Sequence, residues 1–507
     1  MSVSLNGRPL TRDDVVAVIR HGKHVELADS VLDAITSSRA HVEALAEAAT
    51  PTYGVSTGFG ALAVRHIAPE LRTKLQRSLI RSHAAGAGAP VEDEVVRGLM
   101  LLRLRTLASG HTGVRVRTAQ LLAGLLNAHL TPIVHEYGSL GCSGDLAPLS
   151  HIALALMGEG EVRDASGAVR PAAEAMREAG LEPVVLAEKE GLALINGTDG
   201  MLGMLVLACA DLAELFTIAD LTAAMSVEAL LGTDKPFRPE LQALRPHPGQ
   251  AASAANLTAF LAGSGIVASH QNPSCSRVQD AYSLRCTPQV HGAGRDTLAY
   301  VSTVADRELA SWIDNPAVLA DGRVESNGNF HGAPVAYVLD FLAIPVADAA
   351  SIAERRTDRM LDIARSAGLP AFLAEDPGVD SGHMIAQYTQ AAIVSELKRL
   401  ANPASVDSIP SSAMQEDHVS MGWSAARKLR KAVEGLRTVL AIELLTAARA
   451  LDFRKPLEPA PATAAALAAL RETVPGPGPD RYLAPEIAAA EELISSGRLL
   501  AVISPYL

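Results

Sequence analysis

The chemistry that stands out in this sequence belongs to the tripeptide Cys142-Ser143-Gly144, within the stretch GSLGCSGDLAPLSH. Because Gly144 has no side chain, its amide nitrogen can approach the carbonyl carbon of Cys142 closely enough for a five-membered ring to close. If Ser143 then loses its hydroxyl as water, the product is an electron-poor alkene conjugated to an imidazolone. Such a group is a strong electrophile made from the chain alone, and the loop would then act as a cofactor.

The same tripeptide also fits a simpler interpretation. Gly-Cys-Ser-Gly is typical of a tight turn, and a helix is predicted to begin near Leu146, with Asp145 as its N-cap and Pro148 in its first turn. Short motifs match by chance, so the tripeptide alone favours a turn. The rest of the chain has to decide between a turn and an electrophile.

Seven further motifs lie between Tyr53 and Gly422: YGVSTGFG, RSHAAG, LINGTDGM, RPHPGQ, QDAYSLRCTPQVHG, NGNFHG and QEDHVSMG. In this order, and together with the glycine-rich loop, they resemble the motifs of the aromatic amino acid ammonia-lyases. The resemblance implies a 4-methylidene-imidazol-5-one (MIO) group that forms autocatalytically from Cys142-Ser143-Gly144, with no external cofactor. The family usually has Ala at the position of Cys142, and we expect this side chain to lie beside the ring without preventing cyclisation.

The resemblance also implies a set of site residues. Its catalytic members are Tyr53, Cys142, Ser143, Gly144, Asn196 and Tyr282, and its substrate-binding members are Ser82, His83, Gln279, Arg285, Gln289, Phe330 and Glu416. Arg285 suits a bidentate contact with a substrate carboxylate, Gln279 and Gln289 flank it as polar contacts, and Phe330 is expected to pack against the ring or the substrate. Taken singly, an arginine on a helix is usually solvated or ion-paired, and a buried phenylalanine is usually core.

Tyr53 is the expected base, although without the other motifs it would be taken for a packed loop tyrosine. A free phenol titrates near 10, so ionising it at pH 7 costs about 4 kcal/mol unless a positive group lies near. We expect the N-termini of the helices that follow Asp145 and Asn196-Gly197-Thr198 to supply part of that field. Asn196 is expected to contact the ring oxygen and the substrate amine, although it or Thr198 also fits a helix cap.

Two positions bear on the substrate. In the family, a dipeptide on the pocket wall separates histidine-specific members from those acting on phenylalanine or tyrosine, and Ser82-His83 resembles the histidine type. Glu416 lies where histidine-specific members have Glu and phenylalanine-specific members commonly have Gln. A carboxylate can bind or protonate an imidazole, whereas beside a benzene ring it would be an unpaired buried charge.

The resemblance therefore implies non-oxidative elimination of ammonia from L-histidine to give trans-urocanate, the first step of histidine degradation. It also implies a homotetramer whose active sites are shared between subunits. A phenylalanine or tyrosine ammonia-lyase, or an aminomutase using the same electrophile, is the alternative enzyme. A non-enzymatic helical scaffold whose loop never cyclises is the alternative of another class.

The elements that must position these residues are mainly helical. Hydrophobic residues make up 48% of the 507 residues and aromatic residues 4%, which favours a core of close-packed helices. Helical patterns cover residues 29–48, 201–231, 347–367, 385–400, 423–451 and 487–496, and strand signals are limited to fragments such as HVEL. The segment 201–231 is apolar nearly all round, which predicts a buried helix.

We expect a mainly α fold of the ammonia-lyase (fumarase/aspartase-like) superfamily. Its predicted regions are 1–200, loop-rich and carrying the active-site loops, 201–455, a long central bundle, and 456–507, a linker with short helices. The formal charge of −12 argues against a nucleic-acid partner. Four scattered cysteines and no signal peptide or uninterrupted apolar span predict a cytoplasmic chain with no membrane contact and no metal site.

Overall fold

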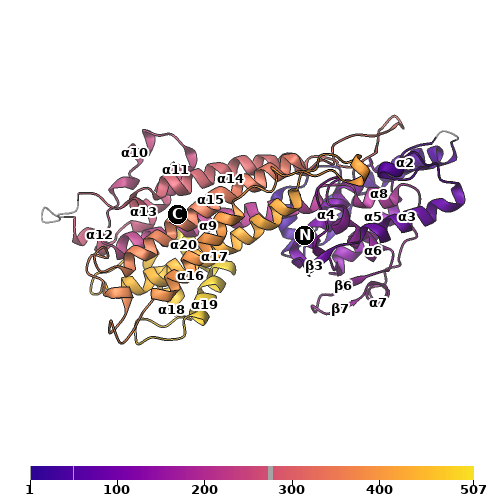
Figure 1. Cartoon of the computed structure of the whole chain (residues 1–507). Helices are drawn as coiled ribbons and strands as arrows, with labels where there is room; N and C mark the ends of the chain where they lie inside the picture. Colours follow the sequence, from indigo (N-terminus) through magenta and orange to yellow (C-terminus); the bar gives the residue numbers. More distant parts are fainter. Residues whose placement is uncertain (1, 49–50, 272–277) are drawn as a thin grey trace. The chain divides into compact units, whose positions relative to one another are not determined.

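The computed structural model describes residues 2–48, 51–271 and 278–507, and it is mainly helical with short strands (Figure 1). Thr50, the first residue of the loop predicted before Gly60, lies outside this description. The chain forms two compact units that are discontinuous in sequence. Unit 1 comprises Met1–Leu207, Ser302–Asp340 and Pro403–Arg427, and unit 2 comprises Ala208–Val301, Phe341–Asn402 and Lys428–Leu507. The division into regions 1–200, 201–455 and 456–507 stays a prediction.

Unit 1 contains the short helices of the N-terminal part. They are α1 (Arg12–Ile19), α2 (Asp29–Glu47), α3 (Pro69–His83), α4 (Asp93–Leu107), α5 (Val116–Asn127), α6 (Leu146–Leu156), α7 (Ala172–Glu178) and α8 (Glu190–Ile195). Thr11 begins α1 with a capping box in which its hydroxyl accepts from the amide of Asp14 at 3.1 Å. Helix α4 is buried along nearly its whole length, and it forms the centre of this unit.

The strands of unit 1 are short and serve as local ties. They are β1 (Val3–Leu5), β2 (Val25–Leu27), β3 (Ala87–Pro90), β4 (Thr131–Pro132), β5 (His135–Tyr137), β6 (Glu161–Arg163), β7 (Val169–Pro171), β8 (Ala317–Val318) and β9 (Val324–Glu325). Strands β1 and β2 pair in parallel, which confirms the strand predicted at HVEL. The pairs β3–β5, β4–β6, β6–β7 and β8–β9 are antiparallel.

The remaining helices are on average longer and include those predicted as a bundle (Figure 1). They are α9 (Asp199–Ala229), α10 (Pro239–Ala243), α11 (Pro248–Leu261), α12 (Gly265–Ser269), α13 (Tyr282–Arg285), α14 (Thr287–Leu309), α15 (Ala333–Leu361), α16 (Met384–Leu400), α17 (Gly422–Asp452), α18 (Pro461–Arg471), α19 (Ala484–Ser495) and α20 (Arg498–Ile503). Helices α9, α14, α15 and α17 each have residues in both units.

Most predicted long helices are confirmed. The buried helix predicted over 201–231 is α9, and those predicted over 385–400 and 423–451 are α16 and α17. The prediction over 347–367 was wrong at both ends, because α15 begins at Ala333 and ends at Leu361. Pro345 lies inside α15, and the prediction began after it, whereas the apolar residues before the proline continue the same buried face.

Within unit 2, buried polar pairs join the long helices. Asp220 of α9 accepts from His291 of α14 at 2.8 Å and from Ser253 of α11 at 2.6 Å. Glu443 of α17 accepts from Arg356 of α15 at 3.0 Å. The Asp220 and Glu443 carboxylates are thus paired with basic side chains inside the bundle, as buried charges require. Among the described residues, α9 and α15 are long and apolar enough to cross a membrane, yet 78% and 61% of their most apolar windows are buried in the protein.

Candidate active site

A cavity of about 540 Å³ in unit 1 brings together residues that are far apart in sequence. Its lining includes six of the predicted site residues: Tyr53, Ser82, His83, Ser143, Asn196 and Glu416. They come from the loop before η1 (Gly60–Leu62), the end of α3, the glycine-rich loop before α6, the end of α8 and the segment after η4 (Ser412–Met414). The backbone loops beside these helices therefore converge on a single cavity.

The glycine-rich loop requires glycine where the tripeptide has it. Gly144 has a φ of +78°, in the region that residues with a side chain rarely adopt, and the next amide, that of Asp145, donates to the carbonyl of Gly197 at 2.7 Å. A Cβ on Gly144 would lie 2.0 Å from the Gly197 carbonyl oxygen. The two backbones therefore approach closely at this point, and Ser143 lines the cavity.

Asp145 does not cap the helix that it precedes, which corrects one prediction. Its carboxylate turns away from α6 and accepts from the amides of Gly200 at 2.9 Å and Met201 at 3.0 Å, so it caps α9 instead. Ser139 donates to the other carboxylate oxygen at 3.1 Å. Burial raises the pKa of Asp145 to about 7, although these three hydrogen bonds lower it. The loop is therefore tied to the start of α9 by a buried side chain.

The surroundings of Tyr53 differ from the prediction. Burial raises the pKa of its phenol, a long hydrogen bond from the Gly60 amide at 3.4 Å opposes the shift, and the negative charge of Glu416 adds to it. The charged side chain that acts on this phenol is a carboxylate, and Arg65 lines the same cavity. The N-terminus of α9 does not supply the field either, because two of its first amides bind Asp145.

Glu416 is the residue that links the pocket wall electrostatically. Burial lowers the pKa of His83, which keeps its imidazole neutral at pH 7, and the charge of Glu416 opposes this shift. Burial also raises the pKa of the Cys142 thiol to about 12, with Glu416 as the next cause, so this thiol stays protonated. Ser82 lies 3.0 Å from Nδ1 of His83 and donates to the carbonyl of Leu79 at 2.9 Å.

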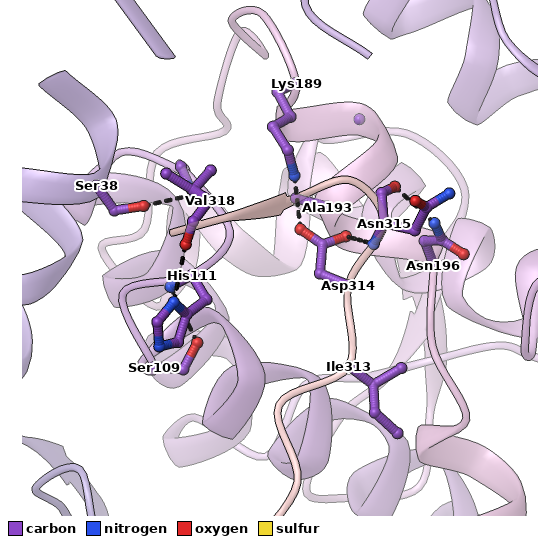
Figure 2. Close-up of polar contacts among 12 residues, drawn as sticks. Ser38, Ser109, His111, Lys189, Ala193, Asn196, Ile313, Asp314, Asn315 and Val318 are labelled. Carbon is purple, nitrogen blue, oxygen red and sulfur yellow. Dashed lines mark hydrogen bonds and ion pairs between the residues drawn. The ribbon is translucent and has the colours of Figure 1, made fainter. Parts of the chain in front are cut away.

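Asn196 does not act as a helix N-cap. It is the C-cap residue of α8, and its Nδ2 donates to the backbone carbonyl of Asn315 at 2.7 Å (Figure 2). Asn196 is 2% exposed, and among the described residues its Oδ1 has no hydrogen-bond partner. Asn315 lines the same cavity. An amide oxygen in this position is available to a ligand that brings a hydrogen-bond donor.

The other predicted site residues do not line this cavity. Gln279, Arg285 and Gln289 line a separate cavity of about 430 Å³ in unit 2. The Arg285 guanidinium there lies 4.7 Å from the centre of the Tyr282 ring, and Tyr282 itself is exposed. Phe330, in unit 1, is half-buried in the turn before α15 and is absent from the cavity lining, and its packing against the ring or the substrate stays a prediction.

The comparisons with known proteins agree with this geometry. Residues 10–472 match the model of a family described as aromatic amino acid lyase. The chain belongs to that family. It is 66% identical over 498 residues to a histidine ammonia-lyase of Streptomyces griseus, covering 98% of this chain and 97% of that protein. It is 50% identical over 496 residues to a histidine ammonia-lyase of Deinococcus radiodurans, covering 98% and 94% of the two chains.

Solved structures of this lyase family share the fold. A histidine ammonia-lyase from Trypanosoma cruzi superposes with a TM-score of 0.91 at 39% identity, covering 100% of this chain and 96% of that one. A tyrosine aminomutase from Streptomyces globisporus superposes with a TM-score of 0.94 at 38% identity, covering 100% and 99%. The predicted family resemblance and fold class are thereby confirmed. Because an aminomutase fits as closely as a lyase, the fold does not decide the reaction.

Three residues around the lyase site escaped the sequence analysis: Lys189, Asp314 and Asn315. Lys189 is fully buried and its Nζ lies 2.6 Å from Asp314 Oδ2. Lys189 and Asp314 could have been found as charged residues beside apolar or turn-forming segments, as in AEKEGLALI and SWIDNPAV, whereas Asn315 carries no such signal. Their pairing joins segments 125 residues apart, which spacing along one chain does not reveal.

Proposed function

We propose that this protein eliminates ammonia from L-histidine to give trans-urocanate, acting as a carbon–nitrogen lyase. One observation carries the assignment to histidine: Ser82, His83 and Glu416 line the same cavity as Ser143. The 66% identity over nearly the whole chain to a histidine ammonia-lyase supports the same activity. An aminomutase acting on tyrosine is the second candidate, because such a protein shares the fold, and the polar lining near Glu416 argues against it.

The electrophile in this proposal is formed by Cys142, Ser143 and Gly144. The group supplies an acceptor for electron density, which makes loss of the poorly leaving amine feasible. The glycine at 144 fits it, because the Gly197 carbonyl leaves no room for a side chain. The Cys142 thiol, kept protonated beside Glu416, contributes no competing thiolate nucleophile at neutral pH.

The pocket residues bind the imidazole and take up the proton. Neutral His83 can donate a hydrogen bond to one nitrogen of the substrate imidazole or accept one from it. The Glu416 carboxylate can accept a hydrogen bond from the other nitrogen. Tyr53 removes the β-proton, and its raised pKa makes the phenol a stronger base once ionised but harder to ionise. A positive group brought by the substrate or by another subunit would lower that cost.

The assembly proposed is a homotetramer with shared active sites. The carboxylate-binding group proposed at Gln279, Arg285 and Gln289 lies in unit 2, whereas the catalytic loop lies in unit 1. In the proposal, unit 2 of another subunit supplies this group to the cavity. Large apolar side chains exposed on α14 to α16, including Tyr300, Phe341 and Tyr388, suit burial between subunits. The predicted cytoplasmic location belongs to the same proposal.

A product assay tests the function. The purified protein is incubated separately with L-histidine, L-phenylalanine and L-tyrosine, and products are followed by ultraviolet absorbance and mass spectrometry. We expect release of ammonia and the urocanate absorbance band with histidine only. A β-amino acid product would indicate an aminomutase, and turnover of phenylalanine or tyrosine in preference to histidine would contradict the assignment.

A further inference from the structure

Both ends of the short helix α8 are attached by side chains to one loop. Lys189 is its N-cap residue and donates to Asp314 Oδ2 at 2.6 Å, while Asn196 is its C-cap residue and donates to the Asn315 carbonyl at 2.7 Å. Figure 2 shows the two contacts on neighbouring residues of the same strand of backbone. Because Asp314 and Asn315 are consecutive, a movement of α8 along the loop would disturb both contacts.

The ion pair at the start of α8 has no evident purpose in stability. Its side chains are 0% and 2% exposed, and burying such a pair costs desolvation that its attraction often does not recover. Its second contact suggests another purpose. Asp314 Oδ1 accepts the backbone N–H of Asn315 at 2.8 Å, so Lys189 holds the carboxylate that in turn holds Asn315.

The Asn315 carbonyl decides which way round the Asn196 amide lies. A carbonyl only accepts hydrogen bonds, so Nδ2 must face it, since a flipped amide would place two oxygen atoms against each other. The Asn196 Oδ1 is therefore turned elsewhere, and within the described part of the chain it has no partner although it is buried. A buried acceptor at a cavity gains most from a ligand that brings an N–H donor.

We propose that the Lys189–Asp314 pair positions the Asn196 amide, through Asn315, so that Oδ1 accepts a hydrogen bond from the amino group of the substrate. This inference rests on the proposed function and assigns Lys189 and Asp314 as positioning residues. It explains why a lysine and an aspartate are retained in the interior next to the cavity. It also makes the contact specific for ligands that carry the amine.

The motif NGNFHG supports the same loop from its other side. The backbone N–H of Asn327 donates to Asn315 Oδ1 at 2.9 Å, and the side-chain Nδ2 of Asn327 donates to the Asp314 backbone carbonyl at 3.1 Å. Asn327 is half-buried and does not line the cavity. Loss of its side chain would therefore loosen the loop without removing a group from the cavity wall, which makes Asn327→Ala a second probe.

The test uses the double variant Lys189→Met/Asp314→Asn in the full-length protein. It removes both charges together, so that no unpaired charge remains, and Asn at 314 still accepts the Asn315 amide. The matched control is Arg430→Met/Asp211→Asn, which removes a buried pair in unit 2 joined at 2.9 Å. For each protein, KM and kcat are measured with L-histidine, and Ki is measured for 3-(imidazol-4-yl)propionate, which lacks the amine.

We expect KM for L-histidine to rise about tenfold in the double variant, which corresponds to one lost hydrogen bond to a charged group, while Ki changes less than twofold. The control should change neither constant by more than twofold, and Asn327→Ala should show the same separation if the double variant does not fold. A parallel rise in KM and Ki, or no change in KM, would overturn the proposal. If the wild-type protein deaminates another amino acid, KM is measured for that amino acid and Ki for its analogue without the amine. Failure of the histidine assignment is then distinguished from failure of the positioning proposal.

Discussion

Tyr53 and Glu416 line one cavity, and the negative charge of Glu416 adds to the burial that raises the pKa of the Tyr53 phenol. In the free protein, Glu416, which is proposed to bind the substrate imidazole, therefore disfavours ionisation of Tyr53, the proposed base. Binding an imidazole that shares a proton with Glu416 would weaken this opposition. Recognition of the substrate and activation of the base are thus coupled through a single carboxylate.

The variant Glu416→Gln should shift the pH dependence of turnover. Without the negative charge, the phenolate of Tyr53 is less disfavoured, so the pKa of Tyr53 falls towards its ordinary value. The alkaline rise of kcat/KM, which reports the free enzyme, should accordingly move to lower pH, and a pH profile of kcat/KM for L-histidine measures it. An inflection at the same pH in both proteins would remove Tyr53 or Glu416 from the proposed pair.

The same substitution should also weaken histidine turnover at neutral pH. We expect kcat/KM for L-histidine to fall about 100-fold, since a charged hydrogen-bond partner of the ligand in the half-buried cavity wall is lost. The melting temperature should change by less than about 2 °C, because Glu416 makes few structural contacts beyond Ser411. Asp417→Asn, which alters the adjacent exposed acid, is the control and should leave kcat/KM unchanged.

Glycine at position 144 should be indispensable for maturation. Gly144→Ala combines a φ of +78° with a Cβ placed 2.0 Å from the Gly197 oxygen, so we expect loss of activity and a chain that has not lost water. Gly180→Ala is the matched control, because φ is +70° there and nothing lies within 4 Å. It should cost about 1–2 kcal/mol of stability and leave activity intact. Equal behaviour of the two variants would show that the close approach is irrelevant.

The sequence predicted the cavity wall better than it predicted the electrostatics. The residues Tyr53, Ser143, Asn196 and Glu416 were found by motif order, and they do meet. The positive neighbour of Tyr53 was inferred from the cost of ionising a phenol. The Asp145 carboxylate binds the N-terminus of α9 instead, and the field expected from the helix after Asp145 stays a prediction. Which of two nearby helix ends a carboxylate caps depends on tertiary packing, and local sequence does not specify it.

Asp145 should make the stability of the protein depend on pH. Burial raises its folded-state pKa from 3.8 to about 7, so the stabilisation is complete below pH 3.8 and is lost as the pH rises through about 7. We expect Asp145→Asn, which keeps an acceptor for the amides of Gly200 and Met201, to reduce the fall in melting temperature between pH 5 and pH 8 by a few degrees. Thermal melts of both proteins at these pH values measure the difference. An equal fall in both would assign the dependence to other groups.

Helix ends and buried polar pairs mark the other limit of the sequence analysis. Helix α15 begins before Pro345 because its apolar face continues through the proline, whereas the predicted helix began only at residue 347. Lys189 and Asp314 read as ordinary charged residues in sequence, and only the fold places them together. Apolar periodicity predicts which helices exist, whereas the pairing of distant polar groups depends on the packing of those helices.

The mass of the mature chain tests the central claim most directly. Ring closure between the Gly144 nitrogen and the Cys142 carbonyl carbon releases the carbonyl oxygen as one water, and loss of the Ser143 hydroxyl releases a second. Intact-protein mass spectrometry of active enzyme will therefore give a chain lighter by two water molecules than its sequence. The Ser143→Ala variant has no hydroxyl to lose, so its mass should not show the loss of the second water. It should also have almost no turnover. A fully active wild-type chain with the unmodified mass would contradict the account.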